Sequence, residues 1–181
     1  GWLAFGALAP LLVAIEGAPW RRAAGLGFAA GLVFWLAPIP WVAGTMIRYG
    51  GLPWPMAGLI LLSLAGYLAL YWGAFCILLS LCPLHSGARD VVVAASLWVA
   101  LEFLRTYLLT GFPWNLLGYS QHRNLALIQV AAVTGVYGVS FVVVAVNAAL
   151  ARLLGRRERW SEGLAAVGVA ALVSALAVAA G

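Results

Sequence analysis

Charged residues are scarce in this chain. Only 8% of its 181 residues are Asp, Glu, Lys or Arg, and lysine is missing altogether. A soluble domain carries about 25% charged and about 45–50% apolar residues, whereas 65% of the residues are hydrophobic here. A soluble chain of this composition could not cover its own core. The composition therefore excludes a soluble globular domain and predicts a membrane protein.

Several patterns typical of catalytic and binding sites are also missing. The chain has 2 cysteines, Cys76 and Cys82, whose separation does not fit a zinc site and disfavours a disulfide within one helix. We expect both to serve apolar packing. The sequence contains no glycine-rich phosphate loop, no cluster of metal ligands and no acid pair of the glycosidase type. We therefore expect no metal, no cofactor and no nucleic-acid partner.

Long, unbroken apolar runs predict transmembrane helices. Backbone polar groups inside a bilayer must pair within the chain, which leaves helices or a closed barrel, and a barrel would alternate apolar and polar residues. The predicted fold class is all-α, a polytopic transmembrane helix bundle in which residues 1–181 form one domain. Runs of about 20 apolar residues give about six helices, at roughly 1–16, 24–46, 55–82, 91–110, 126–151 and 162–180. Pro38 and Pro40 should kink or interrupt the second helix.

The arginines predict the orientation of these helices. Of the 10 basic residues, seven lie in one set of alternate loops and three in the other. Because cytoplasmic loops carry the excess of positive charge, the loops around 17–22, 83–90 and 152–162 are expected inside. Six crossings then place both chain ends outside. The chain begins at Gly1 within an apolar run, so we expect a fragment that lacks an upstream helix.

An acidic and a basic residue stand three positions apart in the fourth predicted helix. Glu102 and Arg105 share one helix face at this spacing. Glu102 lies about 12 Å below the outer helix end, where a lone carboxylate costs at least about 2.5 kcal/mol. We therefore predict an intramembrane ion pair. The pair could be a structural brace or could line a site, and the sequence leaves both readings open.

The loop at 111–124 is the most informative stretch of the chain. It is too apolar for a solvated loop, and its glycines and proline interrupt a continuous helix. Non-helical backbone at membrane depth survives only where protein or a water-filled cavity covers it. The segment could be an aromatic belt at the interface. It could also be a partly re-entrant periplasmic loop lining a lipid-access site, for which the candidate residues are Gly111, Phe112, Pro113, Trp114, Tyr119 and Gln121.

Polar residues recur among small residues in the fifth predicted helix. Small and hydroxylated side chains let helices approach closely and hydrogen-bond within lipid. We therefore expect this helix to pack through its polar side chains, chiefly Tyr137, Ser140 and Asn147.

Several segments together resemble the apolipoprotein N-acyltransferase family. They occur in the family's order along about the whole chain, and the block at 111–121 is the most specific of them. The matching segments are 40–41, 50–53, 97–98, 102–105, 109–114, 117–121 and 135–141, with Asn147.

The resemblance implies an eight-helix membrane domain and a periplasmic nitrilase-like domain with a Glu-Lys-Cys triad. The family's cysteine takes an acyl chain from a phospholipid donor and passes it to the α-amino group of a diacylated lipoprotein acceptor. The membrane domain admits both lipids laterally, and the tryptophan matching Trp114 belongs to that region. The expected location is the bacterial inner membrane, with the chain's C-terminus facing the periplasm.

The chain departs from this family pattern in three respects. It lacks segments matching the family's first helix, its catalytic domain and its last helix, so no catalytic residue is expected here and Cys76 and Cys82 are not the nucleophile. We expect the segment alone to be inactive. An alternative is a membrane anchor domain for a polyprenol-phosphate mannose synthase, and a small transporter is a third, weaker hypothesis because no internal repeat is evident.

Overall fold

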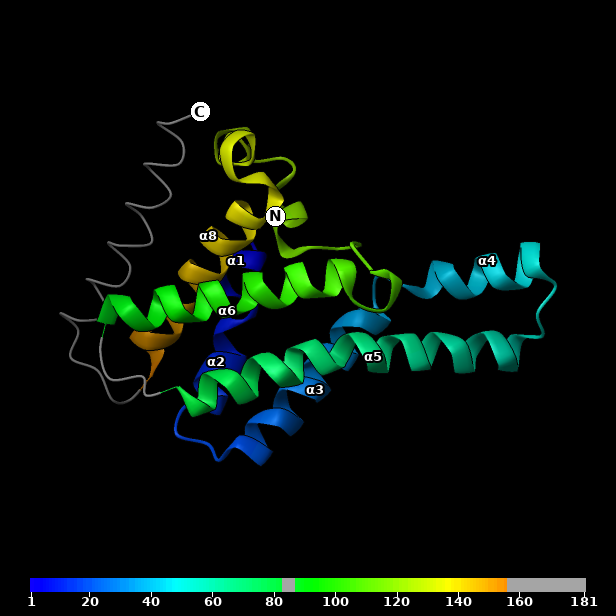
Figure 1. Ribbon diagram of the computed structural model, residues 1–181, viewed down its shortest axis with the longest axis horizontal. Helices are drawn as coiled ribbons and strands as arrows, with labels where there is room; N and C mark the ends of the chain where they lie inside the picture. Colours follow the sequence, from blue (N-terminus) through cyan, green and yellow to red (C-terminus); the bar gives the residue numbers. More distant parts are fainter. Residues whose placement is uncertain (83–86, 156–181) are drawn as a thin grey trace. The chain divides into compact units, whose positions relative to one another are not determined.

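The computed structural model describes residues 1–82 and 87–155, and every element assigned there is helical (Figure 1). The all-α class predicted from composition is thus confirmed for these residues. The chain divides into two compact units, one of residues 1–17 with the chain from Leu81 onward and one of Ala18–Ser80. The elements are α1 (Ala4–Ala7), α2 (Ala9–Ile15), α3 (Trp20–Leu36), α4 (Pro40–Gly50), α5 (Trp54–Leu81), α6 (Gly87–Tyr107), η1 (Leu108–Thr110), η2 (Leu117–Gln121), α7 (Leu125–Ile128) and α8 (Ala131–Leu154).

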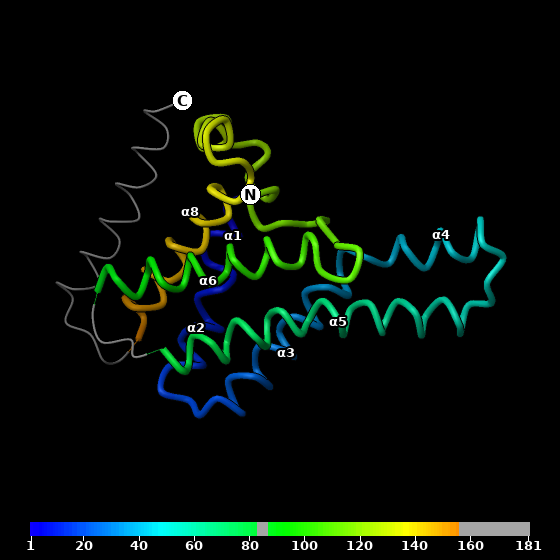
Figure 2. The backbone as a smooth tube through the Cα atoms, viewed as in Figure 1, coloured from blue at the N-terminus to red at the C-terminus, as the bar shows by residue number. Residues whose placement is uncertain are grey.

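Helix α8 is the centre of the first unit. Helix α6 packs against it, and α1, α2, α7 and the short turn η2 also contact it (Figure 2). Alanine and serine, whose small side chains let neighbouring backbones come close within lipid, make up half of the buried residues of α8. They are Val139, Ser140, Val142, Val143, Val144, Ala145, Asn147, Ala148, Ala149 and Ala151. Helix α8 therefore contacts most of the other elements of this unit.

The first predicted span is broken into α1 and α2. Pro10 stands in the first turn of α2, where its missing N–H costs least. The fully buried side chain of Asn147 accepts hydrogen bonds from the backbone N–H groups of Leu8 (2.8 Å) and Ala9 (3.1 Å). Its amide nitrogen donates to the carbonyl of Ala4 at 2.7 Å. One side chain of α8 thus satisfies the backbone groups that the break exposes.

In the second unit, α3 and α5 approach each other closely. Gly27 and Gly31 lie one turn apart on α3 and are both buried. A Cβ atom at Gly27 would lie 2.6 Å from the carbonyl oxygen of Trp72 and 2.7 Å from the Sγ of Cys76. Such small-residue spacing is typical of helix contacts in membranes. The buried Cys76 therefore packs against the α3 backbone, as expected for an apolar packing role.

The predicted interruption at the proline pair is confirmed. Helices α3 and α4 meet at a bend of 50° across a short break that contains Pro38, and Pro40 begins α4. Gly51 then ends α4 with a left-handed φ of 65°, and the chain reverses into α5. The predicted helix at 24–46 is therefore two shorter helices.

Three described helices are long and apolar enough to cross a membrane. They are Trp54–Leu81, Gly87–Thr110 and Ala131–Leu154, and the bent pair of α3 and α4 would make a fourth. The first predicted helix is shorter than a span, and the helix expected at 126–151 is divided into α7 and α8, with a further kink at Gly135. The sixth predicted helix, at 162–180, lies outside the described residues.

Candidate functional site

The loop between α6 and α7 has an unusual backbone. Leu109, Thr110 and Asn115 have positive φ angles of 51°, 72° and 53°. Each such conformation costs about 1–3 kcal/mol in a non-glycine residue and persists only when the surroundings enforce it. Gly111 has a φ of 80°, and a Cβ atom there would overlap the carbonyl group of Thr106. Strong contacts from outside the loop must therefore hold this stretch in place.

Glu102 provides one of these contacts. It lies on α6 with 5% of its surface exposed. Its Oε1 accepts a hydrogen bond from the backbone N–H of Leu117 at 2.7 Å. Its other oxygen, Oε2, is buried and has no hydrogen-bond partner among the described residues. The carboxylate is therefore directed at the start of η2, where it holds a backbone donor.

Arg105 contacts the same loop twice. Its guanidinium, in a residue that is only 3% exposed, donates from Nη1 to the carbonyl oxygen of Trp114 at 3.2 Å. Its own carbonyl accepts from the N–H of Phe112 at 2.9 Å. Glu102 and Arg105 thus both hold the loop through its peptide groups, and the direct ion pair between the two side chains stays a prediction.

Helix α8 holds the loop from the other side. The fully buried hydroxyl of Ser140 accepts from the N–H of Gly118 at 2.8 Å. A Cβ atom at Gly118 would lie 2.6 Å from the carbonyl oxygen of Val136, so the η2 backbone rests directly on α8. Tyr137, one position from Val136, donates to the hydroxyl of Thr106 on α6 at 2.9 Å. These polar side chains each join two separate segments.

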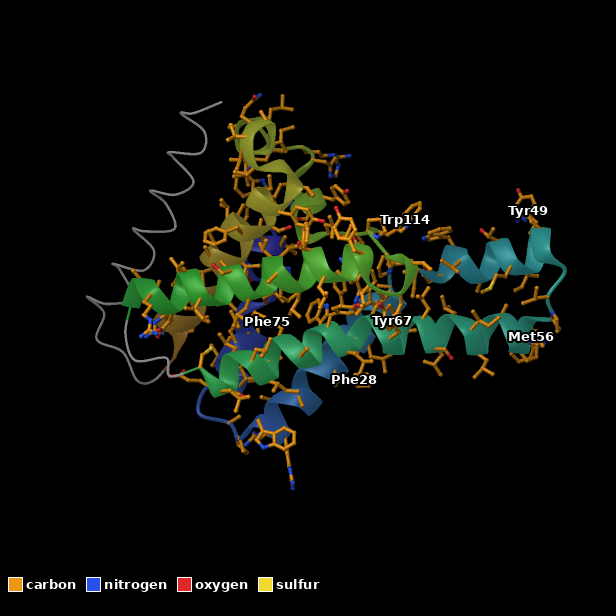
Figure 3. The ribbon with its side chains drawn as sticks, in the orientation of Figure 1. Phe28, Tyr49, Met56, Tyr67, Phe75 and Trp114 are labelled. Atoms are coloured by element: carbon orange, nitrogen blue, oxygen red, sulfur yellow. The ribbon has the colours of Figure 1, made fainter. Side chains whose placement is uncertain are left out.

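Two of the three aromatic residues of the loop remain exposed on this fixed backbone. Trp114 is 57% exposed and Tyr119 is 51% exposed, whereas Phe112 is partly buried. Figure 3 shows Trp114 on the segment that follows α6. Gln121 is buried and donates to the carbonyl of Gly1 at 3.0 Å. The arrangement offers an amphipathic indole beside a polar, well-held backbone, which suits contact with a lipid.

A second polar contact joins α6 and α8 at the ends that lie away from the loop. Asp90 is 4% exposed, and its Oδ2 lies 2.5 Å from Nη1 of Arg152. The sequence reading missed this pair, although one signal was present. Asp90 immediately precedes the helix predicted at 91–110 and Arg152 immediately follows the helix predicted at 126–151, both on the side assigned to the cytoplasm.

Over residues 1–82 and 87–155, no three His, Cys, Asp or Glu residues gather as a metal site would require. Glu102 accepts from a backbone N–H, and Asp90 pairs with an arginine. What the site can do chemically is hold a loop and present apolar and aromatic surface.

These features define a class: a polytopic helical membrane domain with an irregular loop held by buried polar side chains. Residues 1–149 match the family described as the apolipoprotein N-acyltransferase N-terminal domain. The chain therefore belongs to that family.

Individual relatives agree with this assignment. The chain is 40% identical to the apolipoprotein N-acyltransferase of Geobacter metallireducens over 84% of this chain and 29% of that protein. It is 37% identical to the enzyme of that name from Rhodopirellula baltica, over 86% of this chain and 28% of the relative. It is 38% identical to the apolipoprotein N-acyltransferase of Ralstonia nicotianae, over 94% of this chain and 33% of that protein. The chain thus spans between 28% and 33% of the length of these curated relatives.

Proposed function

We propose that this chain is the membrane-embedded, lipid-access part of an apolipoprotein N-acyltransferase. The parent enzyme transfers an acyl chain from a phospholipid to the N-terminal diacylglyceryl-cysteine of a bacterial lipoprotein. Its catalytic triad lies in a nitrilase-like domain outside this chain, and the 181 residues alone are inactive. The observation behind this proposal is the family match over residues 1–149, which includes the whole loop that holds Trp114.

The geometry of the loop supports a lipid-access role. Irregular backbone at membrane depth is stable only where protein covers it, and buried side chains of α6 and α8 do so here. The ring of Trp114 is left more than half exposed. An indole in that position can pack against an acyl chain while its N–H reaches a headgroup or backbone acceptor. The partners are then a phospholipid donor, a diacylated lipoprotein acceptor and the parent's nitrilase-like domain.

Replacing Trp114 in the intact parent enzyme tests this role. We expect Trp114→Ala to abolish most acyl transfer, measured as N-acylation of a diacylated lipopeptide in detergent with added phospholipid. The thermal midpoint should change little, because the exposed ring contributes little to the core. Trp54→Ala is the matched control, since Trp54 is 77% exposed but lies at the start of α5. Near-normal turnover of Trp114→Ala would contradict the lipid-access role and indicate that the loop is only an interfacial anchor.

The contacts at the two ends of the first unit support the proposed orientation. Asp90 bonds Arg152, and a Cβ atom at Gly155 would lie 2.7 Å from Oε2 of Glu16. The chain around residues 16, 90 and 152–155 is therefore at one end, in agreement with the alternate-loop assignment. At the other end Gln121 bonds Gly1. We propose that the end with Arg152 faces the cytoplasm and that the loop with Trp114 faces the periplasm.

Reporter fusions test this orientation directly. A reporter joined after Arg157 should indicate the cytoplasm, and one joined after Gly181 should indicate the periplasm. Labelling of a single cysteine in the 152–162 loop from outside the cell would reverse the proposed orientation. It would also remove the link between this chain and a periplasmic catalytic domain.

A further inference from the structure

Three buried side chains bind the main chain of one short segment. Glu102 accepts from the N–H of Leu117, Arg105 donates to the carbonyl of Trp114, and Ser140 accepts from the N–H of Gly118. We propose that Glu102, Arg105 and Ser140 form a main-chain clamp that sets the position of segment 114–118 and so aims the ring of Trp114. They are positioning residues, and the importance of what they position rests on the proposed function.

Burial and chemistry favour a clamp over a simple helix brace. Charged groups at membrane depth are costly and are retained where they have a defined task. Asp90 joins α6 to α8 through a side-chain partner, Arg152. Glu102 and Arg105 bond to loop backbone. Bonds to peptide groups hold the chain without regard to the identity of the loop side chains.

Backbone strain in the loop shows why several contacts are needed. Leu109, Thr110 and Asn115 hold positive φ angles that relax unless the surroundings enforce them. The three clamp bonds flank the last of these residues, with Trp114 one position before Asn115 and Leu117 and Gly118 just beyond it, and they come from two different helices. A charge-assisted bond from Glu102 is about twice as strong as a neutral one. Loss of the carboxylate should therefore release the segment more than loss of the Ser140 hydroxyl does.

Amide hydrogen exchange in the intact parent protein tests the clamp without relying on catalysis. The peptide covering residues 112–121 contains the N–H groups of Leu117 and Gly118. We expect Glu102→Ala to speed exchange of this peptide about tenfold to a hundredfold, as for a lost bond to a charged group. Glu102→Gln retains an oxygen acceptor and should preserve most of the protection. Ser140→Ala should speed exchange by a smaller factor, about threefold to tenfold.

Two control variants separate the clamp from general destabilisation. Asp90→Asn weakens the opposite end of α6 and should leave exchange in 112–121 near wild type. Ser80→Ala removes a serine whose hydroxyl bonds within its own helix to the carbonyl of Ile77, and it should also have no effect on this peptide. If Asp90→Asn accelerates the loop as much as Glu102→Ala does, the clamp is overturned.

The same variants, assayed for acyl transfer, distinguish failure of the clamp from failure of the proposed function. Unchanged exchange in Glu102→Ala overturns the clamp, whatever happens to turnover. Faster exchange together with lower turnover, both rescued by Glu102→Gln, supports the clamp and its role in aiming Trp114. Faster exchange with unchanged turnover upholds the clamp and overturns the proposed function of the loop.

Discussion

The two ends of α6 use buried charge in different ways. Near its first turn, Asp90 meets Arg152 of α8 at 2.5 Å, so one charge is neutralised by another. Near its last turns, Glu102 and Arg105 bond to the backbone of the following loop at 2.7 Å and 3.2 Å. The first arrangement fixes one helix against another. The second fixes an irregular stretch of the loop and the first residue of η2.

This difference explains why the loop can be both irregular and ordered. A helix satisfies its own backbone groups, so it needs partners only for its side chains. The 111–116 stretch lacks that regular pairing, and in lipid each unsatisfied peptide group would be costly. Buried side chains of α6 and α8 supply the missing partners. Asp90 thus serves helix packing, whereas Glu102 and Arg105 support the loop.

The largest expected effect comes from breaking the charge pair. Arg152→Ala leaves the carboxylate of Asp90 buried without its cation, and such a loss typically costs about 3–5 kcal/mol. We expect the free energy of unfolding, measured by titration with a denaturing detergent, to fall by an amount in this range. Asp90→Ala should cost less, because 20% of the Arg152 side chain is exposed and can reach the interface.

A double variant shows whether the loss at this end is one of pairing. Asp90→Asn combined with Arg152→Gln replaces both charges by neutral groups and should recover much of the stability, since neither charge is then left alone. If the double variant is as unstable as Arg152→Ala, the pair is not what joins α6 to α8. Exchange of the 112–121 peptide should be unaffected in all folded variants.

An intermediate effect is expected where the loop backbone is most constrained. Gly111→Ala places a Cβ at a φ of 80° and against the carbonyl of Thr106, so the turn must open. We expect a loss of about 1–3 kcal/mol, a lower thermal midpoint and reduced acyl transfer in the parent enzyme. Gly44→Ala on α4 is the control, because its Cβ meets nothing within 4 Å and the helix should be stabilised by about 0.5–1 kcal/mol. An unchanged free energy of unfolding in Gly111→Ala would show that this turn does not require glycine.

Much of the fold could be predicted from composition and apolar runs. The all-helical class, the spans around α5 and α6 and the interruption at the proline pair all follow from hydrophobicity and from the chemistry of proline. The breaks between α1 and α2 and between α7 and α8 could not be predicted. The break between α1 and α2 depends on Asn147, which is 139 residues from Leu8 and 138 from Ala9 and gives no local signal there.

The candidate site was predictable in its residues but not in their pairing. Unusual residue types in an apolar setting single out Glu102, Arg105 and Trp114. Glu102 and Arg105 are three positions apart and so share one helix face, and this spacing alone predicts an ion pair. Only the three-dimensional path of the loop brings the peptide groups of 114–118 to α6. The role of Ser140 as an acceptor for Gly118 depends on that same path.

The smallest expected effect concerns a hydrogen bond that joins α6 to α8 near the loop. Tyr137 donates to the hydroxyl of Thr106, which in turn donates to the carbonyl of Glu102, and neither bond reaches the loop. Tyr137→Phe removes the first bond but keeps the ring beside Phe103, 5.6 Å between centroids. We expect a loss of about 0.5–1.5 kcal/mol, read as a small drop in thermal midpoint, while Tyr49→Phe at an exposed site on α4 changes nothing. Exchange in 112–121 should stay at the wild-type rate, because the clamp bonds are intact. Acceleration as large as that of Glu102→Ala would mean that any weakening of the contact between α6 and α8 frees the loop, and the distinction between helix packing and loop support would then fail.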